Sequence, residues 1–215
     1  MHFLITAGPT REPIDPVRYL SNRSSGKMGY ALAEAALEAG HSVTLVSGPV
    51  ALTAPEGLTL IPVETAQQMH DAVATRINEA DIAIFCAAVA DYRVASVADE
   101  KIKKSADELT LRLVKNPDIL GSTREVFGYH GLLIGFAAET NDLAGHALDK
   151  LSRKKCDLIV ANDVSRRDIA FDRDNNEVSL FFPDGTREDL PFAPKREIAG
   201  TLIARIVSLP QRERQ

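Results

Sequence analysis

The chain has 215 residues, of which 45% are hydrophobic and 26% charged, and its formal net charge is −5 at pH 7. These values describe an ordinary globular protein and argue against a nucleic-acid surface, and no apolar run is long enough to predict a membrane span or a signal peptide, so we expect a cytoplasmic protein. Two cysteines, Cys86 and Cys156, lack metal-ligand spacing, and we expect both to be buried free thiols.

The N-terminal region predicts an unusually long connection between a strand and a helix. An apolar run at residues 3–5 leads into it, and apolar residues at helical spacing lead out of it from Met28. We therefore expect a loop of about 20 residues, where 2–6 is common, and long loops at this point of a β-α-β unit usually bind a ligand. Its end, Ser24 to Gly29, offers hydroxyls, glycines and a helix N-terminus, which suit an anion, although a purely structural turn is the alternative. It matches neither the three-glycine dinucleotide pattern nor the P-loop.

Strands and helices alternate along the rest of the chain, which predicts an α/β protein with a Rossmann-like, doubly wound, mostly parallel sheet and helices on both faces. One domain is expected over residues 1–210, followed by a loose tail at 211–215. Asn116 is expected to cap a helix that has Pro117 in its first turn. The other expected elements are strands at 42–47, 59–63, 82–88, 109–113, 132–140 and 157–161, helices at 65–80, 142–155 and 195–207, and an edge β-hairpin between 178 and 192.

Several polar residues lie where the expected strands and helices end. Asp91 follows a strand that ends in small residues, at the edge where open α/β sheets bind ligands, although it could simply start a turn. Residues 95–108 carry Lys101 and two further lysines, and they form either a solvated face or a mobile flap that brings lysines onto phosphates. Lys150 and Lys154 lie near a helix C-terminus, where they could equally serve the helix dipole.

Seven segments, in order along the chain, together resemble bacterial phosphopantothenate–cysteine ligase (phosphopantothenoylcysteine synthetase) of coenzyme A biosynthesis. The resemblance implies a ligase that joins 4′-phosphopantothenate to L-cysteine with CTP as co-substrate. An acyl-cytidylate intermediate would form with release of pyrophosphate, and cysteine would then displace CMP. The segments are TAGPTREP (6–13), YLSNRSSGKMG (19–29), AAVADY (87–92), KIKK (101–104), KNPD (115–118), GFAAET (135–140) and DLIVAN (157–162).

The resemblance also implies roles for individual residues. Asn22, Lys101 and Arg18 match catalytic positions, with Asn22 handling the acyl-cytidylate and Lys101 lying on the flap. Arg18, Asn22 and Ala88 match positions that bind the phosphopantothenoyl substrate. The positions that match nucleotide-binding residues are Phe85, Cys86, Ala87, Asp91, Lys101, Pro117, Asp118, Ile119, Leu120, Phe136, Lys150 and Lys154.

The same resemblance implies partners for the chain. Mg²⁺ should accompany the triphosphate, without metal ligands that can be named, and no flavin is expected in this chain. A homodimer with the flap near the interface is implied. The family often carries this domain behind a flavin-dependent decarboxylase, so such a domain is a candidate partner, and the chain is either free-standing or an excised part. No nucleic acid or membrane is expected as a partner.

Two other functions stay open at this stage. A dinucleotide-dependent oxidoreductase is disfavoured because the three-glycine pattern is missing, and Glu64 would be its only candidate ribose-binding acid. A non-catalytic nucleotide-binding module is disfavoured by Asn22 and by the flap lysines, since simple binding needs no residue that handles an intermediate. The residues alone do not decide between CTP and ATP.

Overall fold

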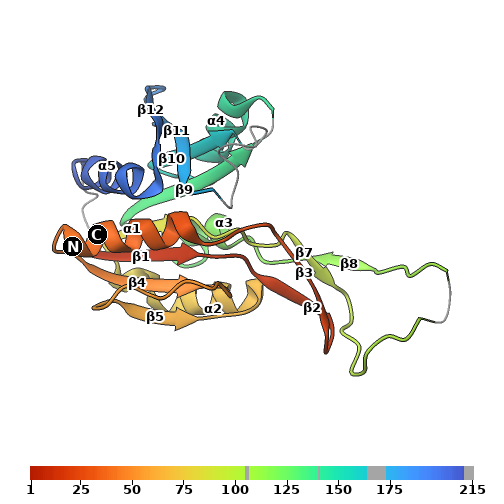
Figure 1. Ribbon diagram of the computed structural model, residues 1–215. Coiled ribbons are helices and arrows are strands. Elements are labelled where there is room, and N and C mark those ends of the chain that lie inside the picture. The colour runs from red at the N-terminus through yellow and green to blue at the C-terminus, as the bar shows by residue number, and fades with distance from the viewer. Residues whose placement is uncertain (105–106, 140, 164–172, 211–215) are drawn as a thin grey trace.

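A computed structural model describes residues 1–104, 107–139, 141–163 and 173–210. Its main feature is an eight-stranded sheet in which six strands are parallel and two form an antiparallel hairpin at one edge (Figure 1). The expected mostly parallel sheet with an edge hairpin is therefore confirmed. From edge to edge the strands are β12 (Arg187–Pro194), β11 (Asn175–Phe181), β10 (Leu158–Asp163), β9 (Leu132–Glu139), β6 (Ile82–Phe85), β1 (His2–Ala7), β4 (Ser42–Ser47) and β5 (Thr59–Pro62).

Helices cover both faces of the sheet, as expected. On one face α1 (Lys27–Glu38) and α5 (Lys195–Val207) pack against the sheet, and on the other α2 (Ala66–Arg76), the short 3₁₀ helix η1 (Ile77–Glu79), α3 (Ile119–Glu125) and α4 (Leu143–Arg153) do so. Successive side chains of a strand point to opposite faces, so Phe3 and Ile5 join the first core and Leu4 the second. Burial on both faces explains why the central strands read as unbroken apolar runs.

Two local predictions are wrong, and long-range contacts explain both. The helix expected from residue 116 is α3, which begins at Ile119, and Asp118 caps it by accepting a hydrogen bond from Gly121 N at 2.9 Å. Asn116 instead donates its side-chain amide to Ala90 O at 2.8 Å. The strand expected at 109–113 is also displaced, because the leucines there alternate along an exposed segment and only the last of them enters β8 (Leu113–Lys115).

The long N-terminal connection is not a single loop, which corrects the expectation. It contains an antiparallel hairpin of β2 (Arg11–Asp15) and β3 (Arg18–Ser21). A second two-stranded sheet, of β7 (Tyr92–Val94) and β8, lies beside it. These four strands and the described residues between β7 and β8 form an arm that projects from the body of the protein (Figure 1). The expected flap lies on this arm, except for residues 105–106, which are outside the described residues, as is the expected tail at 211–215.

No helix within the described ranges has both the length and the apolar character needed to cross a bilayer.

Candidate active site

The chain order of the sheet creates a place for a ligand between β1 and β6. From β1 the chain continues through α1 to β4 on one side, and it later returns to β6 on the other side of β1. Loops that leave two such strands diverge, and ligands of open α/β sheets bind in the crevice between them. Two adjoining cavities of about 780 and 420 Å³ are found there, and we call them the first and the second cavity.

The loop that follows β6, residues 87–91, forms a wall that both cavities share. Three polar side chains hold its backbone. Asn22 donates its side-chain amide to two carbonyl oxygens of this loop, at 3.2 and 3.0 Å. The buried hydroxyl of Thr10 accepts a hydrogen bond from a loop N–H at 3.0 Å, and Asn116 donates to a loop carbonyl at 2.8 Å. A loop rich in alanine thus gains a defined shape from partners that are distant in the sequence.

The first cavity gathers ten of the twelve residues expected to bind a nucleotide. They come from the end of β6, the N-terminal end of α3, the middle of β9 and the last turns of α4. Small and apolar groups make up most of this set, with two lysines and two aspartates among them. The ten are Phe85, Ala87, Asp91, Pro117, Asp118, Ile119, Leu120, Phe136, Lys150 and Lys154.

Lys150, in α4, and Lys154, at the C-terminal cap of α4, contribute positive charge to the first cavity, which Lys115 and Arg153 also line. Lys150 donates to Phe136 O at 2.7 Å, and burial lowers its pKa below the ordinary value of 10.5. Lys154 contacts the carboxylate of Asp118. Burial alone would raise the pKa of Asp118, but the hydrogen bonds from Lys154 and Gly121 N outweigh it and hold the pKa below the ordinary 3.8. An anion in the cavity would stabilise the protonated form of Lys150, so the site suits a phosphate group.

The second cavity contains Asn22, Cys86 and Ala88 of the expected site, together with the first turn of α1. That helix begins after Gly26, whose φ of 77° lies in the left-handed region, and no side chain caps it. The helix also lies very close to β1, because a Cβ at Gly29 would be 2.6 Å from the Cβ of Ala7. Residues 24–29 line the second cavity, so the hydroxyls, glycines and helix N-terminus that the sequence offers to an anion lie beside a cavity.

Sequence reasoning missed several polar residues that line the second cavity. Lys27 lies 2.6 Å from the Asp174 carboxylate, and Lys195 is only 7% exposed. Asn176 also lines the cavity, although the sequence places it far from the N-terminal loop. The hairpin topology is the signal that could have found Asn176 and Lys195. The chain reverses at β11 and again at β12, so the start of β11 and the end of β12 return to the edge where β1 and β6 end.

Cys156 is a buried free thiol, as expected, whereas Cys86 is only half-buried and lines the second cavity, which corrects the expectation for that residue. Both are free, and burial raises the pKa of each to about 12. Because the thiolate is the reactive form of cysteine, neither side chain is suited to act as a nucleophile near neutral pH.

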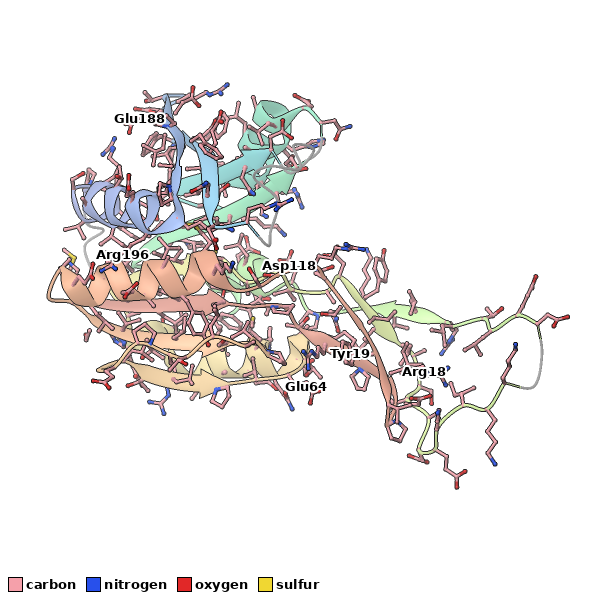
Figure 2. All side chains as sticks on the ribbon, in the orientation of Figure 1. Arg18, Tyr19, Glu64, Asp118, Glu188 and Arg196 are labelled. Carbon is pink, nitrogen blue, oxygen red and sulfur yellow. The ribbon has the colours of Figure 1, made fainter. Side chains whose placement is uncertain are left out.

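Two expected catalytic residues, Arg18 and Lys101, do not line either cavity within this single chain. Both lie on the arm, and Figure 2 shows Arg18 and its neighbour Tyr19 at a distance from Asp118. The arm also exposes large apolar side chains, each between 44% and 58% accessible: Val17, Tyr19, Tyr92, Val97, Leu109 and Leu113.

The described residues around the cavities include neither a cluster that could bind a metal ion nor Glu64, the acid that a dinucleotide site would use. No group of three or more His, Cys, Asp or Glu side chains that could hold a metal ion occurs in the described part of the chain. Glu64 follows β5, its carbonyl accepts a hydrogen bond from Arg11 N at 2.8 Å, and it is not among the residues that line the cavities. The arrangement therefore gives the oxidoreductase alternative no support.

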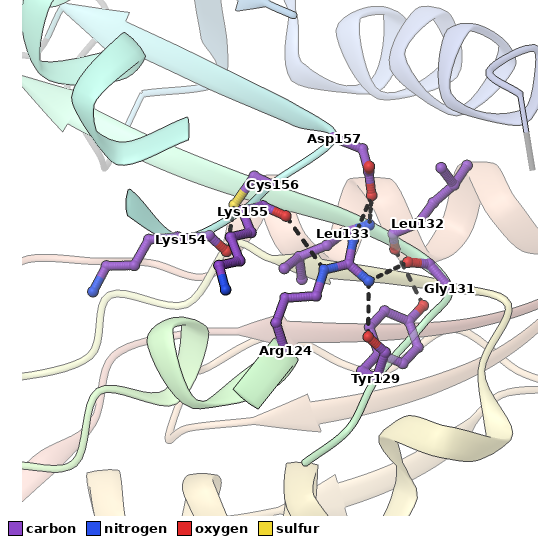
Figure 3. Close-up of polar contacts among 9 residues, drawn as sticks. All are labelled: Arg124, Tyr129, Gly131, Leu132, Leu133, Lys154, Lys155, Cys156 and Asp157. Carbon is purple, nitrogen blue, oxygen red and sulfur yellow. Dashed lines mark hydrogen bonds and ion pairs between the residues drawn. The ribbon is translucent and has the colours of Figure 1, made fainter. Parts of the chain in front are cut away.

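A buried ion pair fixes α3, which forms a wall of the first cavity. Arg124 donates to the Asp157 carboxylate at 2.7 Å and to the carbonyl oxygens of Tyr129 and Gly131 at 2.9 Å each (Figure 3). It also reaches the carbonyl of Lys155 at 3.3 Å. The C-terminal end of α3 is thereby tied to the segments that lead into β9 and β10, and its N-terminal end, with Asp118, faces the cavity.

Comparisons with known proteins identify the family of the chain and its relatives. Residues 1–209 match the family model described as "DNA/pantothenate metabolism flavoprotein C-terminal domain". The coenzyme A biosynthesis bifunctional protein CoaBC of Vibrio vulnificus (strain YJ016) is 50% identical over 208 residues, which are 96% of this chain and 52% of that protein, so the chain spans about half the length of the curated relatives it matches.

Two solved structures show the same fold. The crystal structure of the C-terminal domain of CoaBC superposes with a TM-score of 0.81 at 42% identity and covers 95% of this chain and 93% of that one. The H337A variant of Cab2, in complex with phosphopantothenate-cysteine, gives a TM-score of 0.81 at 20% identity, covering 97% of this chain and 85% of the other. At that identity the second likeness concerns the fold alone.

Proposed function

Because the chain belongs to the family of the DNA/pantothenate metabolism flavoprotein C-terminal domain, we propose that it is a phosphopantothenate–cysteine ligase of coenzyme A biosynthesis. The observation that carries this proposal is the first cavity. It collects ten residues that resemble the nucleotide-binding positions of such ligases, although they come from four separate elements of the fold. A similar protein, CoaBC, is named for coenzyme A biosynthesis.

We propose CTP as the co-substrate, bound with its phosphates near the lysines of α4. The carboxylate of 4′-phosphopantothenate attacks the α-phosphate, the bond to pyrophosphate breaks, and an acyl-cytidylate forms. Protonated Lys150 and Lys154 neutralise negative charge on the phosphates, and Lys101 adds a third positive charge from the flap. Mg²⁺ would accompany the triphosphate and neutralise part of its charge. The carboxylates of the first cavity that could help to hold it are Asp91, Asp118, Glu139 and Asp149.

In the second step the amine of L-cysteine attacks the mixed anhydride, and CMP leaves. Asn22 supports this step, because its amide fixes the loop at 87–91 while the residue itself lines the second cavity. Ala88 contributes the small wall that lets the phosphopantothenoyl group approach the backbone. The protein thus acts mainly by positioning the reactants and neutralising charge.

We also propose that the protein works as a homodimer. Arg18 and Lys101 would then act at a site completed by a second copy, which explains why both lie on the arm and away from the cavities of their own chain. The exposed apolar side chains of the arm support this, because contact with a second copy would bury them. A flavin-dependent decarboxylase domain is a further proposed partner, and this chain itself needs no flavin. The proposed setting is the cytoplasm.

Pyrophosphate release tests the proposal. The protein is mixed with 4′-phosphopantothenate, Mg²⁺ and either CTP or ATP, with and without cysteine. Release that requires phosphopantothenate and prefers CTP is the expected result. Release with ATP alone would keep the reaction and refute the proposed nucleotide. No release with either, from folded protein, would favour a nucleotide-binding module instead.

Two variants separate the half-reactions. Lys101→Ala should slow acyl-cytidylate formation, because a charge is lost from the phosphates, and Lys103→Ala is a control from the same segment. Asn22→Asp should still form the acyl-cytidylate but fail to pass it to cysteine, since a carboxylate cannot donate to the two loop carbonyls that the amide now holds. Trapping the intermediate with labelled phosphopantothenate distinguishes the two, and equal loss of both steps in both variants would refute this division of roles.

A further inference from the structure

Asp15, at the end of β2, is a buried carboxylate that accepts five hydrogen bonds. Its Oδ1 accepts from Val17 N and Arg18 N, both at 3.0 Å. Its Oδ2 accepts from Arg18 Nε at 3.0 Å, from Arg18 Nη2 at 2.5 Å and from Ile102 N at 3.0 Å. Two of these bonds form the tight turn between β2 and β3, two hold the Arg18 side chain, and the fifth reaches the flap.

The contact with the flap has two points. While Asp15 accepts from Ile102 N, Arg18 Nη2 donates to Ile102 O at 2.8 Å. Both backbone groups of Ile102 are therefore bound by one ion pair, and Ile102 follows Lys101 directly in the chain. Ala98 N adds a further bond to the hairpin, to Ile14 O at 3.0 Å. Residues 95–104 contain no helix or strand, so these contacts determine where this segment lies.

The strength of the contact follows from its charge. Hydrogen bonds with an ionised partner are roughly twice as strong as those between neutral groups. The hydrogen bonds of Arg18 hold the pKa of Asp15 well below its ordinary range, so the carboxylate is charged under all ordinary conditions. Its side chain is fully shielded from solvent, whereas that of Arg18 is 42% exposed. The carboxylate of the pair is thus buried, while its guanidinium stays accessible to a ligand.

We propose that Asp15 is a positioning residue that fixes the flap lysine Lys101 through the backbone of Ile102 and, in the same contact, orients Arg18. This inference rests on the proposed function, in which Lys101 neutralises the phosphates and Arg18 lies near the phosphopantothenoyl group. One carboxylate would then set the geometry of two residues that reach the reactants from the arm. Removing this carboxylate should therefore lower activity as Lys101→Ala does, although Lys101 itself is still present.

Asp15→Asn is the first test variant, because the amide keeps the shape of the side chain but loses its charge and replaces an accepting oxygen with a donor. Asp184→Asn is the matched control: Asp184 also accepts from a backbone N–H in a β-turn, that of Thr186 at 2.9 Å, but it lies between β11 and β12. Ile102→Pro is a second variant, since proline lacks the N–H that Asp15 binds and leaves the turn of β2 and β3 unchanged.

Two measurements decide the outcome. Native-state trypsin cleavage after Lys103 and Lys104 should accelerate by about tenfold or more in Asp15→Asn and in Ile102→Pro, because loss of a charged hydrogen bond eases local opening. The bond after Lys101 is left out of the comparison, because trypsin does not cleave a Lys–Pro bond. It should not change in Asp184→Asn. Pyrophosphate release should fall in Asp15→Asn, and combining this change with Lys101→Ala should add less than twofold further loss, since the flap lysine is then already missing.

Unchanged flap cleavage in both Asp15→Asn and Ile102→Pro would overturn the proposal. Losses of pyrophosphate release that multiply in the double variant would also overturn it, because a purely structural effect of Asp15 would be independent of Lys101. Failure of the proposed function gives a different result: the wild-type protein would release no pyrophosphate, while flap cleavage would still respond to Asp15→Asn.

Discussion

Replacing Arg124 with methionine should destabilise the protein strongly although the residue does not line either cavity. The change keeps an unbranched apolar side chain of about the length of the aliphatic part of arginine, and it removes the charged guanidinium. The guanidinium donates hydrogen bonds to the Asp157 carboxylate and to three backbone carbonyls. The side chains of Arg124 and Asp157 are only 9% and 12% exposed. Removing one partner of such a buried pair leaves the other charge uncompensated, at a cost of about 3–5 kcal/mol.

Asp157 would keep the hydrogen bond from Leu133 N at 2.8 Å, which argues for the lower part of that range. Arg76→Met is the control, because Arg76 pairs with Glu79 at the surface, where both side chains are at least half exposed. A surface pair of this kind contributes about 0–1 kcal/mol. The two variants therefore differ in burial while each loses one arginine.

Urea unfolding followed by circular dichroism measures the difference at fixed protomer concentration, since the proposed dimer would make stability depend on concentration. The free energy of unfolding should fall about 3 kcal/mol or more in Arg124→Met and less than about 1 kcal/mol in Arg76→Met. Adding Asp157→Leu to Arg124→Met should restore part of the lost free energy of unfolding, because it removes the buried carboxylate that has lost its arginine. Equal losses in the two single variants would refute the reasoning.

Three further predictions follow from close contacts and from pKa shifts. Gly48→Ala should cost about 1–3 kcal/mol or more by thermal unfolding, because its Cβ would lie 1.8 Å from Pro9 O; a melting temperature like that of wild type would contradict this. The affinity for CTP should be highest below the lowered pKa of Lys150 and should fall as the pH rises through that pKa, because only the protonated lysine attracts phosphate. In calorimetry, Lys150→Arg should shift this fall to higher pH. Identical pH profiles for the two proteins would exclude Lys150 as a phosphate-binding residue. Cys86 and Cys156, each with a pKa of about 12, should resist alkylation near neutral pH until the protein is unfolded, and rapid labelling of the native protein would show otherwise.

The sequence predicted those parts of the fold whose signal is local. The apolar run at β9 and the periodic helix α5 appear where they were expected, whereas β6 ends at Phe85, three residues before its expected end. The first cavity could be anticipated because parallel strands end at a common edge, so Asp91 and Phe136 come together once the fold class is known.

The parts of the fold and the site that the sequence did not predict depend on contacts between residues that are far apart in the sequence. Asn116 and Asp118 can both cap a helix, and the carbonyl of Ala90 decides between them by engaging Asn116. Lys195 lines the second cavity only because two antiparallel strands return the chain to that edge. The position of Lys101 depends on Asp15, which precedes it by many residues and has no sequence signature of its own.

The arm also has a consequence for the entropy of the chain. Its β7–β8 part lies within the connection from β6 to β9, two strands that pair directly, so folding must close that loop whatever its length. Closure entropy grows slowly, by about 0.6 kcal/mol for each doubling of length. The base of the arm is already joined where Ala95 N donates to Arg112 O at 2.8 Å. Replacing residues 96–111 with a tight turn should therefore leave the sheet as stable as before while removing the flap, so stability and flap function can evolve separately in this chain.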